Sequence, residues 1–394
     1  MIHRILLLCL RRTENSCERQ HRLKEKPLPF QQAIRKERLS TVDIHFKVAL
    51  YRYTGRTMNK FLISTVRTVF FSLILGVVFY AGYDYRENEF TEYFGQFKPL
   101  RKSLPEFSLI NPLVGIDSPN AFGINLFTET ENRLRNLIDM KRETGLLDVG
   151  VYYRDLNSSI WFGIDEGKEF IPASLLKMTY ALAAYKKGEA DPSFLDRRFA
   201  YTEEIAAETR QRDNADTTTV LEIGKLYSTQ ELIRIMLEMS DNGARDMLDR
   251  VIEQRYLDEV FMYLGIYAPS AANNFEISTS DYALFFRMLY SSTFINEIHS
   301  EEMLSMLTTT DFPYGITQLL PSKIPVAHKW GVFNFPANEQ NVILHEFHDC
   351  GIVYEPEKPY LLCVMTKGTN QDVLLQFIAE SSRIIYEDTI LGGR

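Results

Sequence analysis

Residues 148–164 read DVGVYYRDLNSSIWFGI, two runs rich in aromatic and β-branched residues on either side of the polar turn Asn157-Ser158-Ser159. The first run spans Asp148–Leu156 and the second spans Ile160–Ile164. Such runs across a short polar turn are typical of a β-hairpin. The sequence therefore predicts that an antiparallel sheet begins here.

Helical patterns flank this hairpin. Upstream, a helix is expected from about Ile124 to Arg142, and downstream the pattern is helical from roughly Leu175 to Met306. Two helix starts in that stretch carry capping residues, Ser228 with Glu231 and, more weakly, Ser278 with Asp281.

The last part of the chain returns to strands, which are expected at Val326–Val332, His348–Tyr354 and Pro359–Met365. A final helix from about Gln371 places its apolar residues on one face, namely Leu374, Phe377, Ile378 and Ile385. The order predicts a mixed α/β fold of the α+β type. Its antiparallel sheet is flanked by N- and C-terminal helices, and an all-helical subdomain is inserted between the second and third strands, so that a cleft forms where they meet.

Composition and charge narrow the class of protein. The chain has 394 residues, 45% of them hydrophobic and 12% aromatic, enough for a substantial core. Residues 1–60 hold 14 basic and 5 acidic side chains, whereas residues 61–394 hold 30 and 47. An acidic main domain argues against nucleic acid as its partner.

An apolar run near the N-terminus predicts a membrane anchor. Residues 68–83 read TVFFSLILGVVFYAGY without a charge, and residues 61–66 extend the run, with Arg67 as the only interruption, to about the length that a bilayer requires. Basic residues precede it, and Asp84, Arg86 and Glu87 follow it, so the amino end is expected in the cytoplasm and the rest outside. A buried core helix is the alternative.

Four segments are expected. Residues 1–57 form a basic cytoplasmic or non-native extension upstream of Met58, and residues 58–83 form a transmembrane signal anchor. Residues 84–122 form an extracytoplasmic linker, and residues 123–394 form the main domain. The predicted location is thus a single-pass membrane protein of the bacterial cell envelope.

No motif indicates a cofactor or a metal. Cys350 and Cys363 flank the turn between two predicted strands, where a disulfide is conceivable, but two buried free thiols are the favoured interpretation. His345 and His348 are three apart on or near a strand and so face opposite ways, which argues against a zinc site. The chain has no glycine-rich phosphate loop.

Ser174 and Lys177 are the first candidates for chemistry. Three residues apart on a helix, they share a face, so the lysine amine can take the proton of the serine hydroxyl if it is neutral. Alone, the pair is more simply explained by a serine that caps the helix and a lysine on its exposed face.

Two further motifs follow in order. Ser240-Asp241-Asn242 interrupts the helical pattern, and Lys329-Trp330-Gly331 lies on a predicted strand, where glycine allows a ligand close to the backbone. A helix boundary and a surface lysine are the simpler alternatives for these two stretches.

Ser-x-x-Lys, Ser-Asp-Asn and Lys-x-Gly, in this order, resemble the motifs of the serine β-lactamase and penicillin-binding-protein superfamily, most closely those of class A. The resemblance extends to GKLYSTQELIRIML, PVAHKWG and HDCGIV, and covers the chain from about Ile124 onward.

The resemblance implies catalytic roles for Ser174 as nucleophile, Lys177 as base, Ser240 as proton relay and Lys329 as carboxylate anchor. It implies substrate-binding roles for Asn242, Trp330, Gly331 and Val332, with the oxyanion between the N–H groups of Ser174 and Val332. Asp241 is expected to tie the local loop.

Two departures from that family stand out. Trp330 replaces its usual Thr or Ser, whose hydroxyl helps to hold the substrate carboxylate; His328 or Asn334 are conceivable substitutes. The loop Glu of class A, in a Glu-x-x-Leu-Asn context, has no match, and only Glu276 remains as a candidate deacylation base, with a capping or surface role as its alternative.

The expected substrate is therefore a β-lactam or a related cell-wall amide, hydrolysed through a Ser174 acyl-enzyme. The alternatives are a penicillin-binding D,D-peptidase with slow deacylation, acting on a peptidoglycan peptide, and a non-catalytic membrane-tethered module that binds cell-wall material.

Overall fold

The computed structural model describes residues 72–77, 106–112, 127–212, 219–269, 275–336 and 342–391. The chain divides into two units, Met1–Asn88 and Glu89–Arg394. Of the first unit only residues 72–77, which are helical, are described. The rest of this section concerns the second unit.

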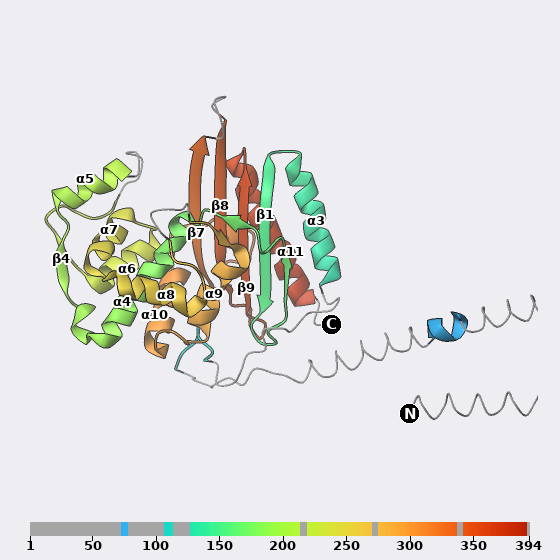
Figure 1. The fold of residues 1–394 in the computed structure, drawn as a ribbon, viewed down its shortest axis with the longest axis horizontal. Coiled ribbons are helices and arrows are strands. Elements are labelled where there is room, and N and C mark those ends of the chain that lie inside the picture. The colour runs from blue at the N-terminus through green and yellow to red at the C-terminus, as the bar shows by residue number, and fades with distance from the viewer. Residues whose placement is uncertain are drawn as a thin grey trace, which may run out of the picture. The chain divides into compact units, whose positions relative to one another are not determined.

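A five-stranded antiparallel sheet forms the centre of this unit, with the strand order β2-β1-β9-β8-β7. The hairpin predicted from residues 148–164 is confirmed as its first two strands (Figure 1). The five strands are β1 (Leu146–Asp155), β2 (Trp161–Ile164), β7 (Val326–Pro336), β8 (Ile343–Val353) and β9 (Tyr360–Gly368). Because β7 is at one end of this order, it is an edge strand.

Helices α3 (Thr128–Arg142) and α11 (Gln371–Leu391) cover one face of the sheet (Figure 1). They bury the stripes that the sequence predicts, including Leu134, Leu137 and Ile138 on α3 and Leu374, Phe377 and Ile378 on α11. In the sheet, alternate residues such as Val149, Val151 and Tyr153 point to this side. Arg133 of α3 also forms ion pairs with Glu387 and Asp388 of α11.

The inserted region between β2 and β7 is mainly helical. Its α-helices are α4 (Lys177–Ala190), α5 (Glu203–Arg212), α6 (Thr229–Glu238), α7 (Asn242–Val251), α8 (Gln254–Leu264), α9 (Thr279–Tyr290) and α10 (Glu297–Thr308). Short elements connect them, namely β3 (Glu169–Phe170), η3 (Ala173–Leu176), η4 (Pro192–Phe194), β4 (Arg198–Ala200), β5 (Leu226–Ser228), β6 (Ile277–Ser278) and η5 (Gly315–Thr317). Both predicted caps are present, the box of Ser228 with Glu231 and the Ser278 cap.

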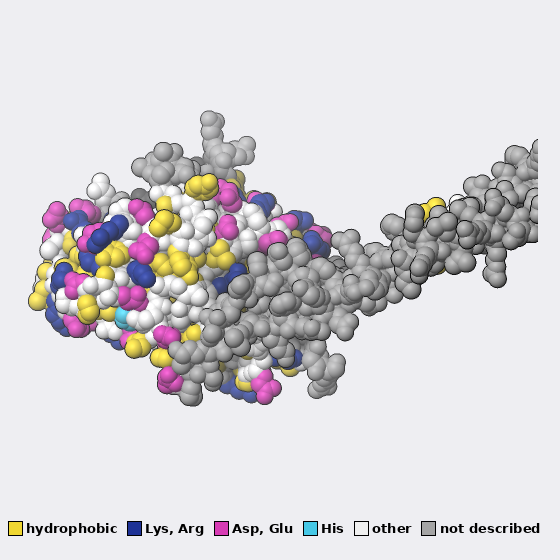
Figure 2. Space-filling view, turned by 60° about the horizontal axis from the view of Figure 1, so that its bottom comes forward, with side chains coloured by type: hydrophobic (Ala, Val, Ile, Leu, Met, Phe, Trp, Pro, Cys, Tyr) yellow, Lys and Arg dark blue, Asp and Glu magenta, His cyan; other side chains and the backbone are white. Residues whose placement is uncertain are grey.

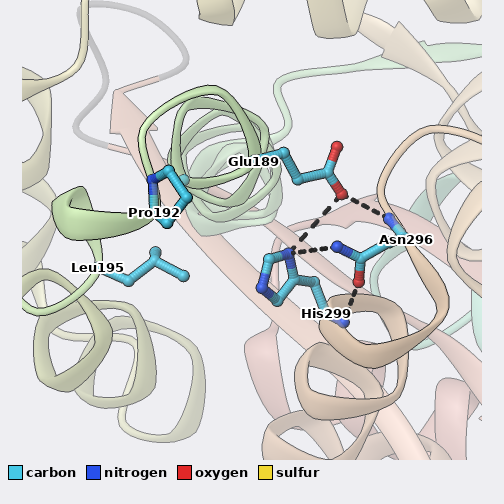
Figure 3. Close-up of a pocket in the computed structure, with 6 residues that line it drawn as sticks. Glu189, Pro192, Leu195, Asn296 and His299 are labelled. Carbon is cyan, nitrogen blue, oxygen red and sulfur yellow. Dashed lines mark hydrogen bonds and ion pairs between the residues drawn. The ribbon is translucent and has the colours of Figure 1, made fainter.

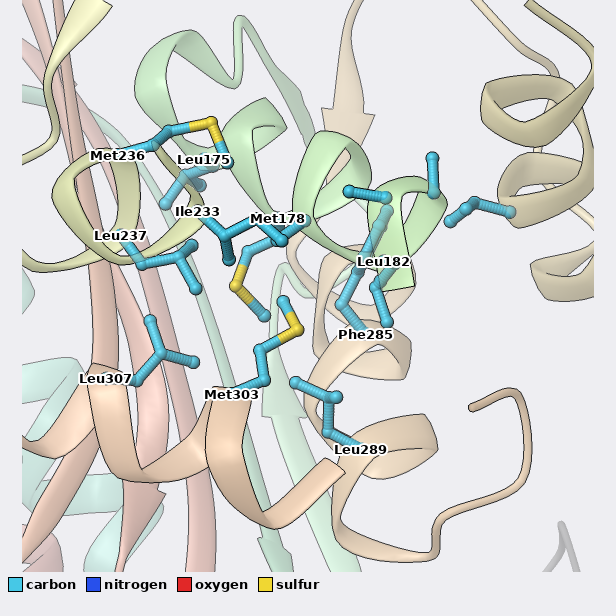
Figure 4. Packing of buried hydrophobic residues seen from close by; sticks show 14 of the residues in the cluster. Leu175, Met178, Leu182, Ile233, Met236, Leu237, Phe285, Leu289, Met303 and Leu307 are labelled. Carbon is cyan, nitrogen blue, oxygen red and sulfur yellow. The ribbon is translucent and has the colours of Figure 1, made fainter. Parts of the chain in front are cut away.

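The core of the inserted region lies between α4, α6, α9 and α10. Figure 4 shows Met178 of α4 between Ile233 of α6 and Met303 of α10, and Leu182 of α4 beside Phe285 of α9. The second face of the sheet, through residues such as Leu361 and Met365, joins the same cluster. Two hydrophobic clusters on opposite faces therefore fix the sheet between the helix pair and the inserted region.

Several predicted boundaries were too short. The strands β7 and β8 extend to Pro336 and begin at Ile343, so they form a longer hairpin than the sequence pattern indicates. The outer part of that hairpin lacks the apolar alternation of a buried strand, since Phe333, Asn334 and Ile343 are exposed. Backbone pairing, not burial, keeps this part extended.

The expectation of two free thiols was wrong. Cys350 on β8 and Cys363 on β9 are directly opposite each other, and a disulfide joins them. The register of two strands across a turn decides this pairing, and a cysteine count does not reveal it.

Residues 106–112, within the predicted linker, pack against the helical region. Consecutive N–H groups of Ser108, Leu109 and Ile110 donate hydrogen bonds to the Glu301 carboxylate at 2.8–3.1 Å. Ile110 is buried in the core cluster. The main domain thus includes a segment that the sequence assigns to the linker.

Within the described residues, no helix is both long and apolar enough to cross a membrane. The predicted anchor, residues 58–83, lies outside the described residues except for the helical stretch 72–77. On the surface of the main domain, Lys and Arg side chains interleave with Asp and Glu on the face shown in Figure 2.

Candidate active site

Ser174 lies in the short 3-10 helix η3, which follows β3 and leads into α4. The residue before it, Ala173, has a φ of 50°, a left-handed conformation that is unfavourable for a side chain with a Cβ. Ser174 is half-buried, and the buried amine of Lys177 is 2.9 Å from its hydroxyl oxygen. The predicted pair therefore meets.

Ser240 lies between α6 and α7 and also has a left-handed backbone, with a φ of 55°. The Lys177 amine donates to the Ser240 carbonyl oxygen at 2.5 Å and lies 3.2 Å from its hydroxyl oxygen. The Lys329 amine, from β7, reaches the same hydroxyl at 2.8 Å. Two strained turns thus carry the two hydroxyl groups, a pattern typical of functional sites.

The four predicted catalytic residues therefore form one continuous hydrogen-bonded chain, Ser174–Lys177–Ser240–Lys329. Three secondary-structure regions contribute to it: the η3–α4 junction, the α6–α7 junction and the edge strand β7.

Electrostatics favour an uncharged amine in this chain. Burial, followed by the charge of Lys177, lowers the pKa of Lys329 well below its ordinary value, while Asp349 and Asp311 oppose the shift. Two ammonium groups that share one serine hydroxyl repel each other, so their protonation is coupled. The site therefore disfavours a charge on both amines at once, and Lys177 can accept the proton of Ser174 only when it is the neutral one of the two.

Asp241 holds the second motif in shape, as the sequence predicts. Its carboxylate caps α7 by accepting from the N–H of Ala244 at 2.8 Å, and it also accepts from the N–H of Val220 and the hydroxyl of Thr219. Asn242 begins α7 and is half-buried. Asp241 is thus a structural member of the site.

Gly331 allows η3 to approach the edge strand. A Cβ at this position would lie 2.9 Å from the Pro172 oxygen and 3.2 Å from the Leu175 nitrogen, closer than side chains tolerate without displacement. Val332 follows it and is half-buried. The two N–H groups expected to hold the oxyanion, of Ser174 and Val332, therefore belong to segments in direct contact.

Sequence reasoning missed three buried side chains that bind the Ser174 turn. The hydroxyl of Tyr282, from α9, donates to the Leu175 carbonyl at 3.0 Å. On β8, Glu346 accepts from the N–H of Ile171 at 2.8 Å, and His348 contacts the carbonyl of the same residue at 3.0 Å. The sequence did contain one indication of His348, because this residue lies in HDCGIV, a stretch that resembles the family.

Trp330 packs into an aromatic stack. Its ring lies 4.5 Å from that of Phe312 and is nearly parallel to that of Phe347, while the Lys329 amine lies 5.1 Å from its centroid. Its indole nitrogen is buried and has no hydrogen-bond partner among the described residues. The side chain of Trp330 thus fills space beside Lys329 where the family usually has a small hydroxyl.

His328 and Asn334, suggested above as substitutes for the family's hydroxyl at position 330, both have other partners. His328 is buried and contacts the Asp349 carboxylate at 2.9 Å, and Asn334 pairs with His345 at 2.7 Å.

Glu276 lies immediately before β6, which pairs with β3, the strand that leads to the Ser174 turn. Its side chain is exposed, and no hydrogen bond to it comes from the part of the chain that the structure describes. The backbone thus runs near the site, but nothing in this part of the chain orients the carboxylate.

His345 and His348 do not converge, since the first bonds exposed Asn334 and the second is fully buried. No cluster of three or more His, Cys, Asp or Glu that could hold a metal occurs among the described residues.

A separate depression of about 480 Å³ lies at the other end of α4, where Glu189, Asn296 and His299 point toward one another (Figure 3). At 1.5 Å per residue, Glu189 lies roughly 18 Å along the helix from Lys177.

Comparisons with known proteins agree with this geometry. A family model described as the β-lactamase enzyme family matches residues 129–389. A comparison with curated proteins found no match.

Solved structures share the fold. PBP-A has a TM-score of 0.56 and 19% identity, covering 70% of this chain and 99% of its own. A β-lactamase from Chitinophaga pinensis (TM-score 0.55, 18% identity, 66% and 99% covered) and a class A β-lactamase from Mycobacterium abscessus (0.53, 19%, 66% and 98%) are similar.

The family model covers well over half of the chain, and the four motif residues meet in one hydrogen-bonded chain. This protein therefore belongs to the β-lactamase enzyme family and is a serine hydrolase.

Proposed function

We propose that this protein is acylated at Ser174 by β-lactams or by cell-wall amides related to D-Ala-D-Ala, and that it releases the acyl group slowly. The observation that carries the proposal is the chain of contacts from the Ser174 hydroxyl through Lys177 and Ser240 to Lys329. A penicillin acyl-enzyme has been solved for a variant of PBP-A, whose fold is similar (TM-score 0.55, 19% identity).

In the proposed reaction, neutral Lys177 takes the proton of Ser174 as the serine oxygen attacks the substrate carbonyl carbon. The carbon–nitrogen bond then breaks, and the leaving nitrogen receives a proton from the Ser240 hydroxyl. Ser240 regains a proton from Lys177, at 3.2 Å. Protons and charge therefore balance over the acylation step.

Lys329 has two tasks in this scheme. Its bond to the Ser240 hydroxyl orients the relay. When Lys177 is neutral, its charge no longer lowers the pKa of Lys329, and Lys329 can then carry the positive charge that attracts the substrate carboxylate. Asn242 is expected to bind the acyl side-chain amide. The N–H groups of Ser174 and Val332 are expected to stabilise the oxyanion, a contribution of about 2.7–4 kcal/mol for one donor in related chemistry.

Slow release is the part of the proposal that separates it from an efficient β-lactamase. Deacylation requires a base that activates water, and Glu276, the only candidate from the sequence, is exposed and unoriented by described neighbours. Trp330 also occupies the position of the carboxylate-binding hydroxyl. A penicillin-binding peptidase with a long-lived acyl-enzyme is therefore favoured over rapid turnover.

We also propose that the domain works outside the cytoplasm, tethered by residues 58–83. The disulfide between Cys350 and Cys363 supports this location, because such bonds persist in oxidising compartments. Fractionation of cells that express the full chain, with protease treatment from outside, tests it. Protection of the domain in intact spheroplasts would contradict it.

A gel assay with a fluorescent penicillin and an unlabelled chase tests the acylation proposal. We expect the full chain to be labelled, the label to persist through the chase, and Ser174→Ala to lose it completely. Ser193→Ala, which changes an exposed serine at η4, is the matched control and should label normally.

Absence of label with every β-lactam and acyl-D-alanine tested would refute acylation. Loss of label within seconds of the chase would refute slow release and leave acylation standing.

A further inference from the structure

Two buried charged or titratable side chains of β8 serve no step of the proposed reaction. Glu346 is 2% exposed and His348 is 0% exposed. Both bind the backbone of Ile171, three residues before the nucleophile. The Glu346 carboxylate accepts from the Ile171 N–H at 2.8 Å, and His348 Nε2 lies 3.0 Å from the Ile171 carbonyl oxygen.

The protonation of the His348 ring follows from its two backbone partners. The Ile171 carbonyl can only accept, so Nε2 carries a proton and donates to it. The Thr366 N–H can only donate, so Nδ1, at 3.3 Å, is the acceptor. The geometry thus selects the neutral ring with its proton on Nε2.

Glu346 is held as a carboxylate. Burial acts to raise its pKa, but the His348 Nε2–H, whose nitrogen lies 3.7 Å from the carboxylate, the hydrogen bond from the Ile171 N–H and the Lys367 amine outweigh burial, so the pKa lies below its ordinary value. The Lys367 amine is 3.2 Å from the second carboxylate oxygen. An ionised acceptor forms a stronger bond to an N–H than a neutral one does.

Strand pairing holds only a short part of the segment that leads to Ser174. Strand β3 has two residues and pairs only with the two residues of β6. Phe170 packs edge-on against the His348 ring at 5.5 Å. On the far side, the absence of a side chain at Gly331 leaves room for the Pro172 carbonyl. Ile171 is therefore the residue at which buried side chains of β8 form hydrogen bonds to the segment that carries the nucleophile.

We propose that Glu346 and His348 form a buried clamp on both backbone groups of Ile171 that positions Ser174 for acylation. Neither residue touches the reacting atoms, so both are positioning residues. This inference rests on the proposed acylation at Ser174. Misplacement of a reacting group by about 1 Å lowers a rate by roughly 100-fold, which sets the scale of the expected effect.

Matched substitutions of His348 and Glu346 separate positioning from mere packing. His348→Gln keeps an amide donor near the place of Nε2, whereas His348→Leu removes it; Glu346→Gln keeps an acceptor, whereas Glu346→Ala removes it. We expect His348→Leu and Glu346→Ala each to lower the limiting acylation rate by about 10- to 100-fold. The Gln variants should stay within about fivefold of the wild type. The apparent dissociation constant of the penicillin should change little, because Lys329 and Asn242 are intact.

His345→Gln is the control, a half-buried histidine three residues away on the same strand, bonded to Asn334. It should acylate at the wild-type rate. Equal acylation by the wild type and by folded His348→Leu and Glu346→Ala would overturn the clamp, and so would Gln variants that are as slow as Leu and Ala.

Hydrogen exchange at the Ile171 amide tests the same contact without any chemistry. In Glu346→Ala this amide should exchange at least about tenfold faster than in the wild type; an unchanged rate would contradict the clamp even if acylation fails in every protein. The wild-type acylation assay alone decides the proposed function. The two proposals can therefore fail separately. If Glu346→Ala does not fold, hydrogen exchange at the Ile171 amide can be measured on Glu346→Gln instead.

Discussion

The two sides of the active site differ in how firmly their functional groups are held. On the acylation side, Lys177 is buried and lies within hydrogen-bond distance of both serines, and Glu346, His348 and Tyr282 fix the turn of the nucleophile. On the side expected to support deacylation, Glu276 is exposed, without a bonding neighbour in the described part of the chain.

This difference divides the reaction into two halves. Preorganised groups lower the activation barrier because they need no rearrangement in the transition state. A solvent-exposed carboxylate, in contrast, loses conformational entropy when it becomes ordered. A site built this way should form an acyl-enzyme readily and hold it. Acylation and release should therefore respond to different substitutions.

The largest effect is expected from Lys177→Met, which removes the base while keeping the length of a buried chain. Acylation of Ser174 should fall by about 10²–10⁴-fold, the usual contribution of a positioned base. Stopped-flow measurement with a fluorescent penicillin checks it. Lys225→Met, at an exposed lysine paired with Glu222, is the control and should be unaffected; a Lys177 variant as fast as this control would break the comparison.

Lys329→Met should lower acylation by roughly 100-fold, through loss of the Ser240 contact and of the carboxylate anchor. The lowered pKa of Lys329 also makes the stability of the folded protein depend on pH. Because burial and Lys177 lower the pKa of Lys329 in the folded protein, the unfolded chain binds the proton more tightly.

The free energy of unfolding of the wild type should thus rise with pH, from the lowered pKa up to about 10.4, the ordinary lysine value. The Met variant should lack this contribution and be no less stable than the wild type at neutral pH. Urea unfolding between pH 6 and pH 10 measures both. A wild type that loses stability over this range relative to the variant would contradict the assigned direction.

Trp330→Ser restores the hydroxyl that the family usually has in the third motif. One regained hydrogen bond to a substrate carboxylate corresponds to about 1–3 kcal/mol, or roughly 5- to 150-fold in the acylation efficiency of carboxylate-bearing β-lactams. The same change removes a stacked ring from Phe312 and should lower the melting temperature. A substrate ester without the carboxylate is the control, and an equal gain for that ester would exclude carboxylate binding as the cause.

The sequence predicted the parts of this molecule that depend on local pattern. The hairpin at residues 148–164, the capping box of Ser228 and the apolar stripe of α11 each follow from residue spacing. The three motifs predicted which residues meet in the site, because each motif occupies one turn or strand and the fold brings the three together. The contact between Lys329 and Ser240 came from the structure alone.

What the sequence missed depends on register and on contacts between distant segments. Ile171 and its partners Glu346 and His348 are about 175 residues apart, and the Cys350–Cys363 disulfide depends on strand pairing. Residues 106–112 looked like a linker because their anchor, Glu301, gives no local signal. None of these contacts follows from periodicity, since they form only after the sheet and helices are in place.

The smallest effect is expected from Glu276→Gln, and it is the sharpest test of the comparison. If the exposed carboxylate does not activate water, the acyl-enzyme of this variant should decay within about twofold of the wild-type rate, because a base that acts is worth 10²–10⁴-fold. The chase half of the penicillin assay measures the decay, with acylation of Ser174 as the internal control for folding. A decay at least 100-fold slower would identify Glu276 as the base, and would imply that its carboxylate becomes oriented only once Ser174 is modified.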